Sequence, residues 1–441
     1  MQAWLAATRV YLEPRVLVVL LLGFASGLPL LLTLSTLTFW LAEAEVDKAA
    51  IGLFALVGLP YTWKFVWSPV IDRVRLPLLT PLLGRRRGWL LLVQALLVVA
   101  ILGLGAGDPQ QNLAQMAVLA VLVAFLSASQ DIVIDAYRVE LLSERQQGAG
   151  AAMVVIGYRV AMLLAGAGAL VIAELAGWFW AYAAMAGCLG IGMVTVLLAP
   201  EPQVGAQALA LGSGGPAQWL RTAVVEPFAE FFRRNGPGIA LLILLFIMLY
   251  KLGDALLGTM TNPFYVELGF SKPEVAAIVK GYGLVATLLG GFLGGVIVNR
   301  RGIVPALWIC GVVQLLSNLV FVLQAWVGHD LTMLTVTISV ENLAGGMGTA
   351  AFVAYLSSLC NLSYTATQYA LLSSFMAQAR TTLSAGGGFL AESLGWVPFF
   401  LASTAAALPG LLLLLMLQRR LAGLGPSGDG AVAAVPGVRP A

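Results

Sequence analysis

Long apolar stretches follow one another along almost the whole chain, with short polar segments between them. Each stretch is close to the roughly 20 residues that a helix needs to cross a hydrocarbon core of about 30 Å. Backbone groups in lipid must bond within a helix or a closed barrel, and unbroken apolar runs exclude the barrel. The pattern therefore predicts twelve helical spans, at residues 16–40, 49–71, 88–106, 113–136, 148–172, 177–198, 238–258, 274–297, 303–326, 331–356, 365–389 and 395–417.

The composition supports a membrane protein and excludes a soluble domain. Of the 441 residues, 60% are hydrophobic and 10% are charged, whereas about 25% are charged in an ordinary soluble domain. The net charge of +3 comes from arginines near lipid, so membrane lipids and no nucleic acid are the expected partners. Cys188, Cys310 and Cys360 lie in or beside apolar spans without paired spacing, which predicts packing residues and neither a disulfide framework nor a metal site.

Lys and Arg fall unequally on the two sides of these spans. Placing both termini in the cytoplasm puts nearly all loop arginines inside and leaves only Lys48 and Lys272 outside, as the positive-inside rule requires. The first span begins at residue 16 without a small-residue cleavage pattern, so an uncleaved helix is expected rather than a signal peptide.

The chain divides into two halves of six spans, residues 1–198 and 238–418, joined by a long loop at residues 199–237. Apolar residues at helical spacing in that loop predict an amphipathic helix on the cytoplasmic leaflet, with a plain tether as the alternative. These residues are Trp219, Val224, Val225, Phe228, Phe231 and Phe232. Residues 419–441 are mostly Gly, Ala and Pro in their last part and are expected to form a disordered cytoplasmic tail.

Two loops at the same place in the two halves share a pattern of arginines. They hold Asp72, Arg73, Arg85, Arg86 and Arg87 in the first half, and Asn299, Arg300 and Arg301 in the second. Both resemble the signature loop of the major facilitator superfamily, whose two six-helix halves rock about a central site. This predicts an all-α membrane protein with 12 helices in two pseudo-symmetric halves. Such arginines anchor topology, and they can also close a gate through pairs such as Asp72 with a neighbouring helix terminus.

Short polar and glycine-containing blocks recur in nearly every span. They include LGFASGLP at 22–29, WKF at 63–65 with WSP at 67–69, GRRRGW at 84–89, SASQD at 127–131, GYR at 157–159, YKLGDA at 250–255, ENLAGGMGT at 341–349 and ATQ at 366–368. Together they resemble the AmpG-type muropeptide permeases of Gram-negative inner membranes. Long members of that family carry about two further C-terminal spans, for which no counterpart is expected in this chain.

The resemblance implies a proton-coupled importer of anhydromuropeptides, which are N-acetylglucosaminyl-anhydro-N-acetylmuramyl peptides, from periplasm to cytoplasm. It links the chain to cell-wall recycling and indirectly to β-lactamase induction, and it implies a monomer in the inner membrane. No cofactor is expected beyond the proton as coupling ion. Moving an anionic substrate into a negative compartment costs about 2.3 kcal/mol of free energy per charge for each 100 mV of membrane potential. Import therefore requires an acidic residue that carries compensating protons.

Four acidic residues inside the spans are candidates for that proton site, because a charge in hydrocarbon costs roughly 2.5 to 3.5 kcal/mol without a partner or water. Asp131 and Asp135 share one helix face. They can form a proton-carrying pair, or they can form a salt-bridge cluster with nearby arginines. Asp254 lies three residues from Lys251, which can neutralise it. Glu341 has no basic neighbour in the sequence, so its partner must come from another helix or be a proton.

The substrate offers carboxylates, sugar rings and amides, and the spans contain side chains for each. The cations are Arg380, Lys64, Arg159, Lys251 and Lys280. Arg380 is the first choice, because it lies in mid-span and offers a planar fork, although it can also pair with Glu341 or Asp254. Ring faces can stack on Trp63, Tyr61, Tyr158, Tyr250 and Tyr282, while Gln130, Asn342, Asn361 and Gln368 can bond hydroxyl and acetamido groups. Most membrane aromatics, however, only pack.

Other functions fit the pattern less well. A carrier of another bulky anion, such as an acyl-coenzyme A, is the alternative within transport. A membrane sensor that has lost transport is the alternative outside it, although paired charges in both halves argue against it. An enzyme is not expected, because no nucleophile, base and orienting residue occur together and His329, the only histidine, is isolated in a short outer loop.

Overall fold

The computed structural model describes residues 9–46, 50, 53–202, 225–271, 274–384 and 387–422. Every element in these ranges is a helix, and nine helices or helical runs among them are long and apolar enough to cross a membrane. The expected spans at 49–71, 331–356 and 365–389 are not among these nine. Lys48 and Lys272, the two lysines expected on the outer side, lie outside the described residues.

The first half is built of long helices with one broken segment. Its long elements are α2 (Pro14–Thr33), α3 (Ser35–Glu43), α8 (Arg85–Gly105), α9 (Leu113–Leu141), α10 (Glu144–Leu163), α11 (Ala169–Ala176) and α12 (Trp178–Leu198), with η1 (Val10–Leu12) before α2 and η4 (Leu164–Gly168) between α10 and α11. The expected continuous helix at 49–71 is wrong, since this stretch consists of η2 (Phe54–Gly58), α5 (Leu59–Trp63), η3 (Lys64–Val66) and α6 (Ser68–Arg73), followed by α7 (Leu79–Leu83). Pro60 and Pro69 each lie in the first turn of a new helical piece, where the missing N–H of proline is tolerated.

The second half follows a short helix at the end of the connecting loop. Its elements are α14 (Glu226–Asn235), α15 (Pro237–Leu249), α16 (Leu252–Glu267), η7 (Val275–Tyr282), α18 (Gly283–Arg301), α19 (Ile303–Val327), α20 (Leu331–Ser358), α21 (Thr365–Ser384), α22 (Gly387–Leu394), α23 (Trp396–Ala405) and α24 (Leu408–Ala422). The expected tail at 419–441 begins too early, because α24 continues to Ala422. Arg419 and Arg420 lie in its last turn, where cations favour the helix dipole. Residues 423–441 lie outside the described residues.

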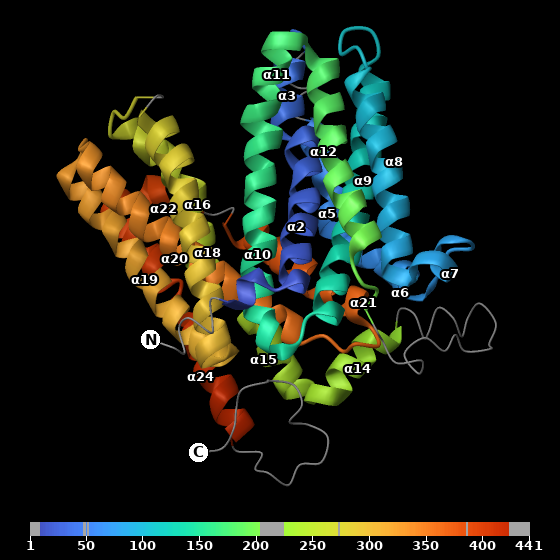
Figure 1. Ribbon diagram of the computed structural model, residues 1–441. Coiled ribbons are helices and arrows are strands. Elements are labelled where there is room, and N and C mark those ends of the chain that lie inside the picture. Colours follow the sequence, from blue (N-terminus) through green and yellow to red (C-terminus); the bar gives the residue numbers. More distant parts are fainter. Residues whose placement is uncertain are drawn as a thin grey trace.

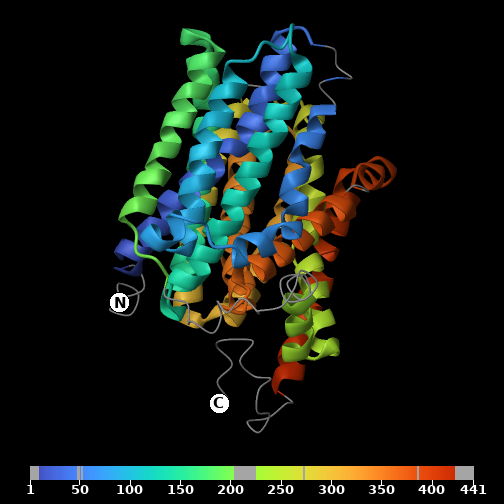
Figure 2. The ribbon, with the colours of Figure 1, turned by 90° about the vertical axis from the view of Figure 1, so that its right-hand side faces the viewer.

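The two halves lie side by side and meet at one end of the bundle. Figure 1 shows both described chain ends at that end, and the halves diverge toward the opposite one. We name the first end, which carries Arg85 and Arg301, the arginine-rich end. The main contacts between halves join α10 to α18 and α20, and α21 to α9, α6, η3 and α5. Figure 2 shows from the side that the long helices of the first half run roughly parallel along the bundle.

Close helix packing within each half depends on glycine. The helices α2 and α10 approach so closely that a Cβ built on Gly157 would lie 2.1 Å from the Leu20 carbonyl oxygen, and α18 and α20 approach so closely that one on Gly290 would lie 2.1 Å from the Leu343 oxygen. Small residues permit such backbone approach between membrane helices. The contact surfaces of both pairs therefore depend on the missing side chains.

Gly157→Ala is expected to lower the thermal midpoint of the purified protein. The added methyl group meets backbone atoms that cannot rotate away, and overpacking of this kind costs about 1–3 kcal/mol. Gly187→Ala in α12 is the matched control, because a Cβ there meets no atom within 4 Å. Equal midpoints for the two variants would show that α2 and α10 do not depend on this close approach.

Candidate functional site

The two aspartates of α9 have different surroundings. Asp131 accepts a hydrogen bond of 2.5 Å from the Ser26 hydroxyl of α2. Asp135 lies 3.8 Å from Lys64 Nζ and 3.7 Å from Arg138 Nη2. Asp135 is therefore held between two cations, as the salt-bridge interpretation expects, whereas Asp131 is held by a neutral hydroxyl.

Arg138 joins this cluster to the second half of the chain. Its side chain is fully buried, its Nη1 donates to the Ser357 hydroxyl of α20 at 2.8 Å, and its guanidinium lies 5.2 Å from the centre of the Tyr369 ring in α21. A buried guanidinium needs both a counter-charge and hydrogen-bond acceptors. Asp135 of α9 supplies the counter-charge, Ser357 of α20 supplies one acceptor, and Tyr369 of α21 supplies a ring face.

The second half contributes a matching group of charges. Lys251 Nζ lies 3.9 Å from Asp254 and donates to the Thr349 hydroxyl of α20 at 2.7 Å. Lys251 stands at the break between α15 and α16, which lets its side chain reach α20. Glu341, which precedes Thr349 on α20, interacts electrostatically with Asp254, Lys251 and Arg159.

Arg159 brings the two groups together. It lies on α10 of the first half and is exposed, and it interacts electrostatically with Glu341 of the second half and with its neighbour Tyr158. Tyr158 in turn interacts with Asp131 and Tyr61. The structure therefore assembles most of the charged residues that the sequence indicates into one region between the halves.

Several candidates for sugar binding are instead used in packing. Gln130 is fully buried and donates to the Ala25 carbonyl oxygen at 2.9 Å. Tyr250 donates to the Leu307 oxygen at 2.8 Å, and its ring stacks on Phe352. In this structure both donors therefore bond to other helices, and the assignment of Gln130 and Tyr250 to substrate binding stays a prediction.

Asn342 and Tyr282 lie at contacts of α20 with its neighbours. Asn342 Oδ1 accepts from the Thr287 hydroxyl at 2.9 Å, and its Nδ2 donates to the Ile338 oxygen. Asn342 thus holds α18 against α20 in this structure, and its assignment as a substrate ligand stays a prediction. Tyr282 is half-exposed, with its hydroxyl 2.9 Å from that of Ser339.

Three other candidates lie elsewhere or are not described. Trp63 is 56% exposed, stacks on Phe65 and lines an apolar groove of about 930 Å³ between α5 and α9. Its expected contact with the substrate stays a prediction. Arg380 belongs to α21 and Lys280 to η7, but both side chains lie outside the described part of the structure.

A second charged cluster closes the arginine-rich end. Arg86 Nη2 donates to Asp72 at 2.8 Å and to Glu140 at 2.5 Å, and all three side chains are at most 2% exposed. Asp72 also accepts from the Thr367 backbone N–H and hydroxyl, each at 2.7 Å. Thr367 lies in the first turn of α21, where a carboxylate is favoured by the helix dipole. This is the pairing of Asp72 with a helix terminus that the sequence predicts.

The remaining arginines of the first loop bind neighbouring helix ends. Arg85 donates to the Asp72 carbonyl oxygen at 2.6 Å. Arg87 donates to the oxygens of Val196 and Leu197 at the end of α12, and the Arg73 guanidinium lies 5.2 Å from the centre of the Tyr364 ring. In the second half, Arg300 and Arg301 are exposed at the end of α18.

The connecting loop ends in α14, which lies beneath the bundle at the arginine-rich end (Figure 1). Glu230 of α14 accepts from Gln368 at 2.6 Å and from Asn361 at 2.9 Å, and Arg234 donates to the Leu359 oxygen at 2.6 Å. Asn361 and Gln368 therefore hold α14 in this structure, and their assignment to sugar binding stays a prediction. A helix in this loop is confirmed at 226–235, whereas 203–224, with Trp219, lies outside the described residues.

Glu230→Ala is expected to release α14 from the loop before α21. The variant loses two charge-assisted hydrogen bonds, each worth about 1.5–3 kcal/mol. Backbone amides of α14 should then exchange hydrogen at least about tenfold faster than in the parent protein. Glu226→Ala is the control, because Glu226 pairs with Arg233 of the same helix and with no other described residue. Equal exchange in both variants would contradict the anchoring role.

Several residues of these clusters are not indicated as functional candidates by the sequence pattern. Arg138 is one of the nearby arginines that the sequence offers as partners of Asp135, whereas Glu140 is not indicated because the predicted fourth span ends at residue 136 and α9 continues to Leu141. Ser26 and Thr367 are neutral hydroxyls whose partners lie more than 100 residues away, so no local pattern marks them. Among the described residues, no three His, Cys, Asp or Glu side chains are grouped so that they could hold a metal ion.

Known proteins resemble this chain over nearly its whole length. The model of the family described as Major Facilitator Superfamily matches residues 16–377. The chain is 44% identical over 415 residues to the anhydromuropeptide permease of Escherichia coli strain K12, covering 94% of this chain and 82% of that protein. It is 37% identical over 419 residues to a Rickettsia conorii protein named as transporter AmpG 4, covering 94% and 99%. The solved structure of the proton:xylose symporter XylE bound to 6-bromo-6-deoxy-D-glucose has a TM-score of 0.65 at 14% identity, covers 93% of this chain and 95% of its own, and shares the fold alone.

Proposed function

Because this chain belongs to the major facilitator superfamily, and within it to the AmpG-type permease family, we propose that it imports anhydromuropeptides together with protons. It is a membrane transporter and not an enzyme. The proposed substrate class is based on the 44% identity of this chain, over 94% of its length, to a permease named for anhydromuropeptides. The role that follows is the recovery of cell-wall fragments, with β-lactamase induction as an indirect consequence.

The proposed orientation places the arginine-rich end in the cytoplasm, in the inner membrane of a Gram-negative bacterium. The positive-inside rule supports it, since Arg73, Arg86, Arg301 and Arg419 all belong to that end. In this orientation the halves are joined on the cytoplasmic side and diverge toward the periplasm (Figure 1). An importer that awaits substrate would have this arrangement.

Glu341 is the proposed proton site. Asp135 is held between two cations, and Asp254 lies beside Lys251, so both have counter-charges close by. Glu341 instead interacts with charges of both halves, including Arg159 of the first. A carboxyl at the boundary between halves can exchange its proton when the halves move, because its neighbours change. Asp131, held by a hydroxyl, is the second candidate.

Substrate carboxylates are proposed to bind Arg159 and Lys251, with Arg380 retained from the sequence pattern. Arg159 is exposed between the halves, unlike the fully buried Arg138. Its guanidinium can bind a carboxylate with two parallel hydrogen bonds. Tyr61 and Tyr158, near Asp131, are the aromatic residues best placed to contact a sugar ring.

Gating is proposed to depend on the cluster of Asp72, Arg86 and Glu140. Asp72 holds the N-terminus of α21 against the first half through Thr367. Opening toward the cytoplasm must break this contact and the bond from Arg138 to Ser357. Protonation and substrate binding would shift the balance between these closed and open arrangements.

Purified protein in liposomes, with an imposed pH gradient and labelled anhydromuropeptide, tests the function directly. Uptake should exceed equilibrium only when the outside is more acidic. Uptake that ignores the gradient would eliminate proton coupling. Preferential uptake of an acyl-coenzyme A would favour the alternative carrier, and binding without any uptake would favour a membrane sensor.

A further inference from the structure

An apolar groove of about 1020 Å³ runs along the flank of the first half, at the arginine-rich end. Its walls are formed by α2 and α12, with Leu17 and Leu21 on one side and Ile191, Val194 and Leu198 on the other. The charged residues between the halves do not line it. The groove is therefore separate from the proposed transport site.

The groove is open because α12 carries glycine at two of the positions that line it. A Cβ built on Gly187 or Gly190 would meet no atom within 4 Å. From Gly187 to Leu198 the helix rises about 16 Å, close to half of a hydrocarbon core of about 30 Å. The groove is thus about as long, measured along α12, as one membrane leaflet is thick.

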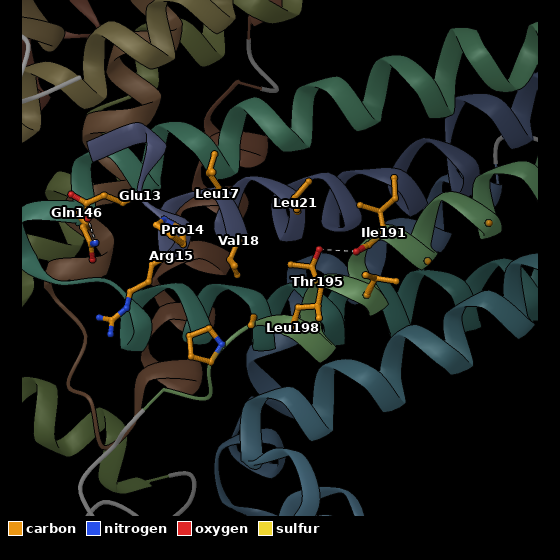
Figure 3. Close-up of a pocket in the computed structure, with 15 residues that line it drawn as sticks. Glu13, Pro14, Arg15, Leu17, Val18, Leu21, Gln146, Ile191, Thr195 and Leu198 are labelled. Atoms are coloured by element: carbon orange, nitrogen blue, oxygen red, sulfur yellow. Dashed lines mark hydrogen bonds between the residues drawn. The ribbon is translucent and has the colours of Figure 1, made fainter. Parts of the chain in front are cut away.

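The mouth of the groove is polar and holds one carboxylate, that of Glu13, and one guanidinium, that of Arg15. Figure 3 shows Glu13, Arg15 and Gln146 together at one end of the lining, with the apolar side chains extending away from them. Glu13, the only acidic residue in the described lining, is paired with Arg145 at 3.1 Å and accepts a hydrogen bond from Gln146. Arg15 is exposed, and no ion pair or hydrogen bond to another described residue holds its guanidinium. Arg15 is therefore available to an anion.

We propose that this groove binds an anionic phospholipid of the adjacent leaflet, with an acyl chain between α2 and α12 and the phosphate on Arg15. The guanidinium fork matches the geometry of a phosphate group. Basic pockets between membrane helices hold anionic headgroups in this way. A zwitterionic lipid fits less well, because the Glu13 carboxylate that would attract its ammonium group is already paired with Arg145.

The experiment uses the full chain, purified in detergent with an equimolar mixture of phosphatidylglycerol and phosphatidylethanolamine. Native mass spectrometry counts the lipids that each variant retains. The parent protein is expected to retain phosphatidylglycerol, and Arg15→Gln should retain about fivefold less. Arg419→Gln is the matched control, an exposed arginine of the same end in the other half, and should retain the parent amount.

A second variant tests the groove independently of the charge. Gly190→Leu places a side chain in the open space and should exclude the acyl chain, whereas Gly238→Leu, at a position that is equally free of neighbours, should not. Size-exclusion chromatography establishes that each variant remains folded. The proposal is overturned if Arg15→Gln and Gly190→Leu retain phosphatidylglycerol like the parent protein. It is equally overturned if phosphatidylethanolamine is retained to the same extent, because the lipid would then be a nonspecific neighbour.

Discussion

Glu341→Gln is expected to abolish accumulation of anhydromuropeptide against its gradient while leaving exchange of substrate across the membrane intact. One proton that moves down a gradient of one pH unit supplies about 1.4 kcal/mol, enough for about tenfold accumulation. Glutamine has nearly the shape of glutamate but carries no titratable proton. The ratio of internal to external substrate should therefore fall from about ten to about one.

The measurement uses liposomes with the membrane potential clamped at zero, so that only the pH gradient drives uptake. Glu267→Gln is the control, because Glu267 is exposed at the end of α16. Glu341→Asp keeps a titratable group and should restore part of the accumulation. Normal accumulation by Glu341→Gln would remove Glu341 as the proton site and leave Asp131 as the next candidate. Loss of both accumulation and exchange would instead assign Glu341 to substrate binding or to the movement of the halves.

Arg86→Met is expected to destabilise the protein more than any other change at the arginine-rich end. It leaves Asp72 and Glu140 buried without their common partner. Removing one partner of a buried ion pair costs about 3–5 kcal/mol, and the remaining partners of the two carboxylates include Arg85, at 3.4 Å from Glu140, and Thr367, which donates to Asp72. The thermal midpoint of the purified protein, followed by its loss of folded monomer on heating, measures this effect.

Arg301→Met provides the comparison, since Arg301 occupies the corresponding loop of the second half and is exposed. Its midpoint should remain near that of the parent protein. Arg86→Lys keeps the charge but cannot reach Asp72 and Glu140 with separate N–H groups of a planar fork, so it should fall between the two. If the thermal midpoint of Arg86→Met equals that of Arg301→Met, the buried cluster does not stabilise the closed end.

The contacts that join the halves also indicate how the protein opens. Asp72 with Thr367, and Arg138 with Ser357, cross from one half to the other at the arginine-rich end. Each contact pairs a charge with a neutral group, whereas the Arg86 pairs stay within the first half. Separating the halves therefore costs hydrogen bonds to neutral partners and leaves the buried ion pairs intact. Such contacts can be broken and remade in every transport cycle.

The sequence by itself determined that the chain is a helical membrane protein, with two halves and arginines gathered at one end. Apolar runs near 20 residues leave few other structures for a backbone without water. The rarity of charges in these runs also identified five candidate residues, Asp131, Asp135, Arg159, Lys251 and Glu341. A charge within a membrane span is costly unless a partner or water stabilises it. Helical spacing identified the face that Asp131 and Asp135 share.

Only the tertiary structure decided what these residues contact. Four polar side chains near spans look alike in the sequence, namely Gln130, Tyr250, Asn361 and Gln368. In the structure the first two bond to backbone oxygens of neighbouring helices, and the last two bond to Glu230 of α14. Thr367 likewise meets Asp72 from 295 residues away. The periodicity of a helix fixes which way a side chain points around its own axis, but a hydrogen bond or ion pair depends on which other helix lies there. That neighbour is set by the packing of the whole bundle.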